Sequence, residues 1–321
     1  VQPHLVVVGS GLAGYSLARE VRRLDAALPI TVITADGGEV YTKPMLSNAF
    51  ARQHEPDDLV QMPAAELSEK LGIVIRTRTR ATAIDRDNSM LKLHSGSGDA
   101  ELQYDRLVLA LGADARVFPV EGSGSVDIFT VNDLDDYRNW RQKIGQRGRV
   151  LLIGAGLIGC AVANDLADAG FEVALVDPAP WPLARLLPRE IGEMLATALQ
   201  KRGCRLYLGQ QVVRSGGDAS GSIAELADGA SLAFDHAPSA VGLKARTSLA
   251  KQAGLDVGEG IIIDRTMRTS DPRIFALGDC AQSEAGVLPF IAPLLAEAKT
   301  LAAILTGDAR ELQFPAMPVI V

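Results

Sequence analysis

The sequence contains little cysteine, which limits its covalent chemistry. Its 321 residues include three cysteines, Cys160, Cys204 and Cys280, which are far apart and odd in number. A disulfide-stapled scaffold needs paired cysteines, and a zinc site needs closely spaced Cys or His ligands, so the sequence disfavours both. We therefore expect no metal site, and a reducing, cytoplasmic compartment.

Long apolar runs and blocks of positive charge are also missing. No run approaches the roughly 20 apolar residues of a membrane span, and we expect no signal peptide. The chain has 32 Lys and Arg against 39 Asp and Glu, a net charge of −7, and no basic tract that would suggest nucleic acid. The sequence therefore predicts a globular protein that binds neither membrane nor nucleic acid.

Glycine, in contrast, is abundant, and two glycine clusters share one spacing. Residues 9–14 read GSGLAG and residues 154–159 read GAGLIG, so the two clusters start 145 residues apart. In a GxGxxG motif the first glycine forms a tight turn, the second lets the backbone approach a pyrophosphate, and the third lets helix pack on strand. Glycine turns that bind nothing also occur, but two copies favour two bound dinucleotides and electron transfer between them.

The segments around each glycine cluster support this interpretation. Residues 5–8 and 150–153 have the composition of buried parallel strands, and residues 15–24 and 160–169 are typical of helices. A helix that begins at the motif offers free N–H groups and a positive dipole to phosphates.

An acidic residue follows the next apolar run in each half. Asp36 lies 22 residues past Gly14, and Asp177 lies 18 residues past Gly159. A carboxylate there can accept hydrogen bonds from a ribose and repels a 2′-phosphate, which favours NADH over NADPH. The alternative for either acid is an ordinary turn residue or a helix cap.

Later segments of the two halves also match, which indicates an internal duplication. No Ser- or Pro-rich linker separates the halves, so we expect the second domain to be inserted into the first. The further strands expected are residues 30–33, 73–75, 91–93, 107–112, 172–176, 206–208, 231–234, 239–242 and 273–279, and a helix is expected from about 293 to 305.

The order of these motifs is similar to that of a known superfamily. An N-terminal GxGxxG, the segment Ala110-Leu111-Gly112, a second GxGxxG and the pair Gly278-Asp279 follow one another. The chain thus resembles the FAD-dependent pyridine nucleotide-disulfide oxidoreductases, which are related to glutathione reductase. Within them, residues 41–47 and 163–166 resemble those of bacterial rubredoxin reductases.

The resemblance implies an α/β fold with two Rossmann-like dinucleotide-binding domains, the NAD domain being inserted into a discontinuous FAD domain. Residues 1–117 and 244–312 would form the FAD-binding domain, and residues 118–243 the NAD-binding domain. Relatives normally continue into a C-terminal domain, which residues 313–321 would begin, whereas this sequence ends at Val321.

The resemblance also implies residues that bind the two cofactors. Lys43 and Pro44 would lie beside the flavin, where Lys43 would have the catalytic role of stabilising negative charge on the reduced ring. Judged alone, Lys43 is an ordinary solvated loop lysine. Asp279 would bind the ribityl or phosphate side of FAD. The other positions implied for FAD are Gly9, Gly11, Leu12, Ala13, Gly14, Asp36, Ala110, Gly112 and Gly278. Those implied in the NADH half are Gly154, Gly156, Leu157, Ile158, Gly159, Asp177 and Gly242.

The absence of a cysteine pair suggests the route by which electrons leave the protein. Disulfide reductases of the superfamily carry a redox cysteine pair soon after the first ribose-binding acid, and no cysteine lies between Asp36 and Glu69. Electrons would therefore leave from the flavin, which accepts a hydride and releases electrons singly, to rubredoxin. The alternatives are a ferredoxin reductase of an oxygenase system and a non-catalytic NADH-sensing flavoprotein.

Two residues depart from the superfamily pattern, and a separate expectation concerns the surface that would bind rubredoxin. Ala161 stands where many relatives carry a glutamate near the nicotinamide, and Pro238 interrupts a run expected to be a continuous strand. Rubredoxins are generally acidic, so a basic docking patch is expected despite the net charge of −7. Residues 138–149 supply five basic side chains as a candidate, although such a run is more often a solvated helix face.

Overall fold

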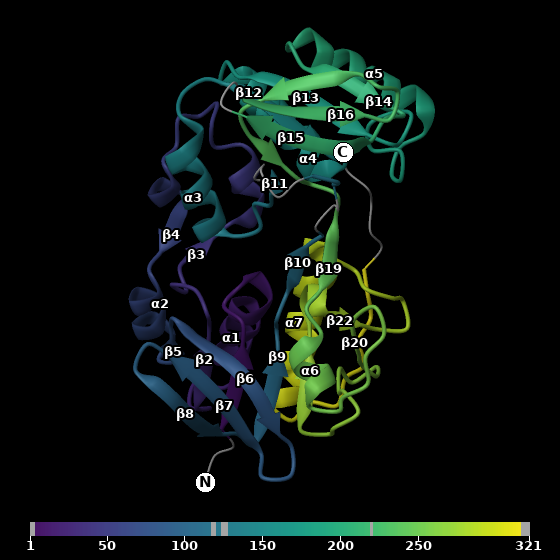
Figure 1. Ribbon diagram of the computed structural model, residues 1–321. Coiled ribbons are helices and arrows are strands. Elements are labelled where there is room, and N and C mark those ends of the chain that lie inside the picture. Colours follow the sequence, from purple (N-terminus) through teal and green to yellow (C-terminus); the bar gives the residue numbers. More distant parts are fainter. Residues whose placement is uncertain (1–3, 117–119, 123–127, 219–220, 316–321) are drawn as a thin grey trace. The chain divides into compact units, whose positions relative to one another are not determined.

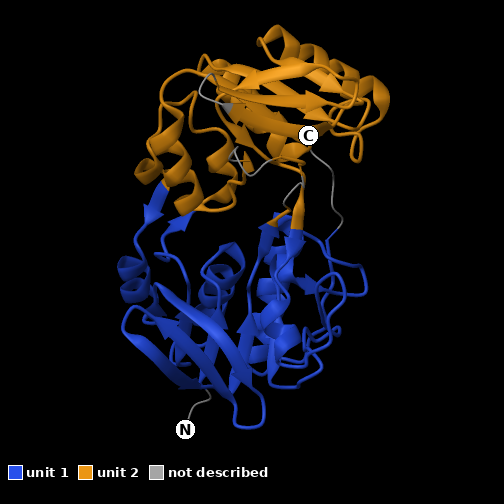
Figure 2. Cartoon of the chain, viewed as in Figure 1, with its two compact units in different colours: residues 1–41, 60–114, 244–321 blue, residues 42–59, 115–243 orange. Residues whose placement is uncertain are grey.

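The computed structural model describes residues 4–116, 120–122, 128–218 and 221–315. The chain divides into two compact units, shown in Figure 2. The first unit comprises residues 1–41, 60–114 and 244–321, and the second comprises residues 42–59 and 115–243. The chain therefore passes from one unit to the other at four points. Residues 316–321, which fall within the segment expected to begin a C-terminal domain, lie outside the described residues, as do residues 117–119 at the expected domain boundary.

The first unit is built on a five-stranded parallel sheet (Figure 1). Its strand order is β21-β9-β1-β2-β5, with β1 (Leu5–Val8) in the centre and fully buried. Its other strands are β2 (Ile30–Ile33), β5 (Val74–Arg76), β9 (Arg106–Leu109) and β21 (Ile274–Ala276). These runs are rich in Val, Ile and Leu, which suit a sheet buried on both faces.

The register of this sheet brings the sequence motifs to one edge. Val8 pairs with Ile33 on one side and with Leu109 on the other, and Leu109 pairs with Ala276. Because these four residues end their strands at the same level, the segments that follow them meet at the carboxyl edge. The first glycine cluster, Asp36, Ala110 and Gly278 all follow one of these strand ends.

Helices and a smaller sheet complete the first unit. Helix α1 (Leu12–Leu24) packs on α7 (Ile291–Leu305). The antiparallel sheet consists of β6 (Thr79–Asp85), β7 (Met90–Ser95) and β8 (Gly98–Gln103). The remaining elements are β3 (Val40–Tyr41), β4 (Val60–Met62), α2 (Ala64–Leu71), β10 (Ala113–Ala115), β19 (Leu243–Ala245), α6 (Ser248–Gln252), β20 (Ile261–Ile262), η4 (Gly278–Cys280) and β22 (Ala281–Gln282), and the unit boundaries fall within β10 and β19.

The second unit repeats the strand-turn-helix arrangement. Its parallel strands are β12 (Arg149–Ile153), β13 (Glu172–Asp177) and β14 (Arg205–Leu208), and α4 (Leu157–Asp168) follows β12. An antiparallel sheet contains β15 (Val212–Asp218), β16 (Gly221–Leu226) and β17 (Ser231–Phe234). The other elements are η1 (Lys43–Ser47), η2 (Pro56–Leu59), β11 (Ile128–Phe129), α3 (Leu134–Ile144), α5 (Arg189–Lys201) and β18 (Ala237–Pro238).

The strand expected at 239–242 lies earlier in the chain. Strand β18 runs through Pro238 and pairs in parallel with β11, while residues 240–242 are irregular. Toward β12 the pairing consists of two isolated bridges, Val150 with His236 and Ile153 with Ser239. Proline has no N–H, so Pro238 donates no hydrogen bond to β12, and the two bridges lie before and after it at His236 and Ser239.

The observed topology is α/β, with two Rossmann-like units of which the second is inserted into a discontinuous first, as the sequence predicted. The unit boundaries differ from the expected ones mainly at residues 42–59, which group with the second unit. No helix in the described part of the chain has the length and apolar character that a membrane crossing requires.

Candidate functional site

The first glycine cluster forms a turn in which two positions admit only glycine. Gly9 has a φ of +120°, and a Cβ built on it would lie 2.1 Å from the carbonyl oxygen of Ala110. A Cβ on Gly14 would lie 1.9 Å from the carbonyl oxygen of Gly9. A Cβ on Gly11, in contrast, would meet no atom within 4 Å. The middle glycine therefore faces open space, where a ligand can approach the backbone.

The second cluster repeats this pattern. Gly154 has a φ of +106°, and its Cβ would lie 2.6 Å from the carbonyl oxygen of Ala240. A Cβ on Gly159 would lie 1.8 Å from the carbonyl oxygen of Gly154, while one on Gly156 would meet nothing within 4 Å. The duplication inferred from the sequence thus extends to the individual contacts of each glycine.

Each turn leads directly into a helix with an open N-terminus. Gly11 is the N-cap of α1 and Gly156 is the N-cap of α4. Glycine has no side chain with which to cap the first-turn N–H groups, so these groups and the helix dipole remain available to an anion. Helix α1 begins three residues before the expected start at Tyr15, and α4 likewise begins before Cys160.

Apolar side chains stand exposed beside both turns. Leu12 is 46% exposed, and Leu157 and Ile158 are each 47% exposed. Ala13 is buried instead and lies against Gly278. A Cβ built on Gly278 would lie 2.8 Å from the Ala13 Cβ. Gly278, with a φ of +74°, therefore brings the η4 segment against α1.

Asp36 is fixed by three donors at the edge of the first sheet. Its Oδ1 accepts hydrogen bonds from Thr34 Oγ1 at 2.5 Å, from the Gly38 N–H at 2.9 Å and from Ser10 Oγ at 3.1 Å. Ser10 lies inside the first glycine cluster, so this network joins the turn to the acid. The sequence interpretation did not identify Ser10 or Thr34, although Ser10 occupies a variable position of the motif.

Asp177 has a different set of partners. Its Oδ2 accepts from the Ala155 N–H at 2.6 Å, and its Oδ1 accepts from the Ala179 N–H at 2.7 Å. The carboxylate thus holds both the second glycine turn and its own loop, while each oxygen retains a further lone pair. Asp177 can therefore both fix its turn and accept a hydrogen bond from a ligand.

A buried glutamate that the sequence interpretation missed supports the Gly278-Asp279 segment. Glu297, on α7, is 5% exposed, and its Oε2 accepts the Gly278 N–H at 2.6 Å. Burial raises the pKa of Glu297 to about 7, with a smaller contribution from the nearby charge of Asp279. A signal was present in the sequence, because Glu297 occupies the same helix face as the buried Leu294 and Leu301.

The cysteines are not placed for redox chemistry. All three are free and buried, and burial raises the thiol pKa of Cys160 and of Cys280 to about 12 and that of Cys204 to about 11. Thiols with a raised pKa are poor nucleophiles. Over the described ranges, acidic, histidine and cysteine side chains do not gather in a group that could hold a metal ion.

Lys43 and Pro44 lie in η1 of the second unit. The Lys43 ammonium donates to Asn132 Oδ1 at 2.7 Å, and Pro44 occupies the first turn of η1. Two other predicted glycines accept backbone hydrogen bonds close to the unit boundaries. The Gly112 carbonyl accepts the Arg246 N–H at 3.0 Å, and the Gly242 carbonyl accepts the Arg116 N–H at 2.9 Å.

The basic residues of 138–149 are largely engaged within their own unit. Arg138 pairs with Asp57 and Asp135, and Arg149 pairs with Asp235 at 2.6 Å. Arg141 pairs with Glu55 and stacks over the Phe50 ring. These ion pairs favour the interpretation of an ordinary helix face over that of a free docking patch.

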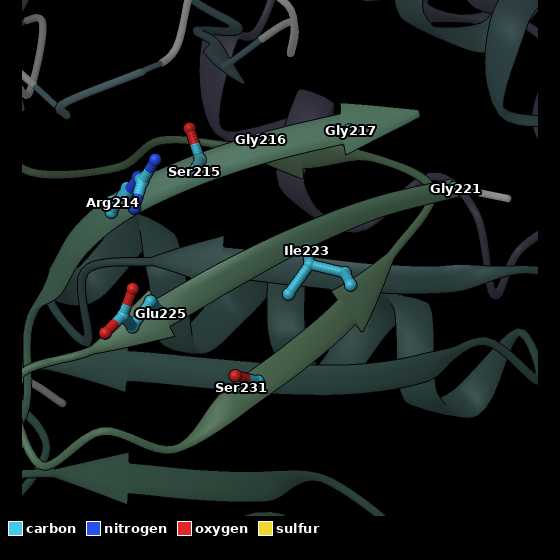
Figure 3. Close-up of a pocket in the computed structure, with 8 residues that line it drawn as sticks. All are labelled: Arg214, Ser215, Gly216, Gly217, Gly221, Ile223, Glu225 and Ser231. Atoms are coloured by element: carbon cyan, nitrogen blue, oxygen red, sulfur yellow. The ribbon is translucent and has the colours of Figure 1, made fainter. Parts of the chain in front are cut away.

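Two further features lie in the second unit. Ala161 lies exposed on α4, and its methyl group supplies no polar contact. A hollow of about 320 Å³ lies on the exposed face of β15, β16 and β17 (Figure 3). Its lining includes Arg214, Gly216, Ile223 and Glu225, and contains none of the residues predicted from the sequence.

Comparison with known proteins agrees with this geometry. The family described as pyridine nucleotide-disulphide oxidoreductase matches residues 3–298. The chain is 41% identical to a rubredoxin-NAD(+) reductase of Alcanivorax borkumensis over 99% of this chain and 82% of the relative. It is 40% identical to a nitric oxide reductase FlRd-NAD(+) reductase of Pectobacterium atrosepticum over 98% of this chain and 82% of the relative.

A solved structure gives the same result at the level of the fold. A ferredoxin reductase of Rhodopseudomonas palustris superposes with a TM-score of 0.89 at 30% identity, covering 98% of this chain and 78% of that one. The superfamily and the fold predicted from the sequence are confirmed. The chain belongs to the pyridine nucleotide-disulphide oxidoreductase family.

Proposed function

We propose that this protein is a flavoenzyme that binds FAD at the first glycine turn and NADH at the second. The observation that carries the proposal is the repeated cradle, in which two glycines are sterically required and the middle one is open. The open position fits a pyrophosphate at each helix N-terminus. When bound, FAD accepts a hydride from NADH as two electrons and releases them one at a time.

The first unit supplies the residues for FAD. Gly9, Gly11 and Gly14 shape the cradle, and Leu12 and Ala13 lie at the start of its helix. Asp36, already oriented by Ser10 and Thr34, is placed to accept a ribose hydroxyl. Ala110, Gly112 and the pair Gly278-Asp279 follow neighbouring strands at the same sheet edge.

The second unit supplies the residues for NADH. Gly154, Gly156 and Gly159 shape the second cradle, and the exposed Leu157 and Ile158 offer apolar contact. The negative charge of Asp177 favours a free 2′-hydroxyl over a 2′-phosphate. Gly242 follows β18, which pairs with β11. We assign Lys43 and Pro44, which belong to the same unit, to the flavin.

We further propose rubredoxin as the electron acceptor and the cytoplasm as the compartment. The relative at 41% identity is named a rubredoxin-NAD(+) reductase, and the buried thiols leave electron exit to the flavin. The free cysteines fit a reducing compartment. A ferredoxin is the second candidate acceptor, because the R. palustris reductase shares this fold at a TM-score of 0.89.

The proposal is tested by spectroscopy and turnover. We expect the purified protein to carry a flavin absorbance band that NADH bleaches without oxygen and that oxidised rubredoxin restores. Faster recovery with a ferredoxin would select the second candidate. A protein that binds no FAD after reconstitution would contradict the proposal. A bound flavin that saturating NADH does not reduce within seconds would favour an NADH-sensing flavoprotein over an enzyme.

Substitution at the open glycine of the second cradle tests the NADH site. Gly156→Val should raise the KM for NADH about tenfold or more with little change in kcat, because its Cβ meets no protein atom within 4 Å and the side chain enters the space assigned to the pyrophosphate. The matched control is Gly216→Val, since Gly216 is equally open and lies in the same unit. Equal KM values for the two variants would reject this assignment.

A further inference from the structure

The segment that carries Lys43 is attached to the helix of the second glycine turn. Residues 42–59, here called the strap, precede the second unit in sequence yet group with it. Asp165, on α4, is 3% exposed. Its Oδ2 accepts the Phe50 N–H at 2.8 Å, and its Oδ1 accepts the Ala51 N–H at 2.9 Å. One buried carboxylate thus holds two successive amides of the strap.

Burying a carboxylate is unfavourable unless hydrogen bonds compensate for its lost hydration. Burial raises the pKa of Asp165, and the two amide donors oppose that shift. An apolar residue at this position would leave the buried N–H of Phe50 without an acceptor, which is also unfavourable, and would remove the acceptor of the Ala51 N–H. Asp165 and the strap therefore depend on each other for a fixed geometry.

Ring contacts hold the strap beside this carboxylate. The Phe50 ring centroid lies 4.9 Å from that of Trp140, 5.7 Å from that of Tyr137 and 5.8 Å from that of Phe171. The Arg141 guanidinium lies 4.5 Å from the Phe50 centroid and also pairs with Glu55 of the strap. Edge-on ring pairs and a cation over a ring each add to the area that Phe50 buries.

At the other end of the strap, Lys43 is oriented by a residue of the second unit. Its ammonium donates to Asn132 Oδ1 at 2.7 Å. Asn132 is itself held, because its N–H donates to Asp136 Oδ2 at 2.9 Å at the start of α3. The contacts of the lysine head and of the strap backbone therefore both lead to elements of the second unit.

We propose that Asp165 is a positioning residue that sets the location of Lys43 through the strap. The inference rests on the proposed function, because it concerns the lysine assigned to the flavin. Helix α4 carries the second glycine turn at its N-terminus and Asp165 farther along, so one rigid element holds both the NADH cradle and the strap. Lys43 is accordingly positioned by the unit that binds NADH.

The test compares Asp165→Asn with Asp168→Asn. An asparagine presents one acceptor and turns an NH₂ group toward an amide donor, so the strap loses one of its two hydrogen bonds. Asp168 lies on the same helix, where its carboxylate pairs with Arg202, a residue outside the strap. Asp165→Asn should slow anaerobic flavin reduction by NADH about tenfold or more, with FAD content and NADH affinity unchanged, while Asp168→Asn retains the wild-type rate.

Combination with Lys43→Met separates positioning from general damage. If Asp165 acts through Lys43, the double variant should reduce no more slowly than Lys43→Met alone. Multiplying effects would overturn the proposal, as would a wild-type rate for Asp165→Asn or for Lys43→Met. If Asp165→Asn does not fold, Phe50→Leu weakens the same attachment and must show the same non-additivity. A wild-type protein that NADH does not reduce would instead reject the proposed function.

Discussion

Alanine in place of Gly14 should weaken FAD binding by about two orders of magnitude. The added methyl group would stand 1.9 Å from the Gly9 carbonyl oxygen, a backbone atom, so α1 must move away from β1 and the cradle must open. Overpacking of this kind costs about 3 kcal/mol, which corresponds to a loss of affinity of roughly a hundredfold. FAD retained after gel filtration and the Kd from flavin fluorescence titration would measure the effect.

A control for the Gly14 variant is available within the same unit. Gly96 lies in the turn between β7 and β8, and a Cβ built on it would meet nothing within 4 Å. Gly96→Ala should therefore bind FAD as the wild type does. Wild-type affinity in Gly14→Ala would show that the helix does not pack on the strand as closely as the contact distances require.

Glutamine in place of Glu297 should remove a pH-dependent loss of stability. The folded-state pKa of Glu297 is raised from its ordinary 4.5 to about 7, so the folded protein binds this proton more tightly than the unfolded chain does. The corresponding stabilisation is present below pH 4.5 and is lost as the pH rises to about 7. Its size is at most about 3 kcal/mol, from about 1.4 kcal/mol for each pKa unit.

Glu297→Gln keeps an acceptor for the Gly278 N–H but cannot ionise. At pH 8 this variant should resist urea better than the wild type by up to about 3 kcal/mol, and at pH 4.5 the two should agree, both measured with saturating FAD. Glu69→Gln, an exposed acid on α2, should show no such difference between the two pH values. An equal gap between Glu297→Gln and wild type at both pH values would contradict a titrating Glu297.

Local patterns predicted the framework of each unit. The apolar runs at 5–8 and 30–33 became β1 and β2 with unchanged bounds, because buried parallel strands are nearly continuous in Val, Ile and Leu. The helix expected from about 293 starts at Ile291, which places Pro293 in the first turn, where a missing N–H is tolerated. Both glycine motifs were identifiable because the first and third glycine of each are sterically required and the middle one leaves the backbone open.

What the sequence could not supply depends on contacts between distant residues. Asp165 accepts from Phe50 across 115 positions, and Lys43 donates to Asn132 across 89. No regular sequence spacing, such as that of helices or strands, predicts either hydrogen bond. The placement of the strap was missed for the same reason, since aromatic packing around Phe50 assigns it to the second unit. Pro238 was expected to break a strand, yet the strand tolerates it because only the pairing toward β12 is interrupted.

The four crossings between the units also bear on the order in which the chain can fold during synthesis. The second unit has all its residues once position 243 has been made. The first unit then still lacks β21, so β9 presents an open sheet edge until residues 274–276 emerge. The second unit can thus fold on the ribosome while the first unit is still incomplete. Because each unit consists of separate segments of the chain, a single truncation yields neither unit alone.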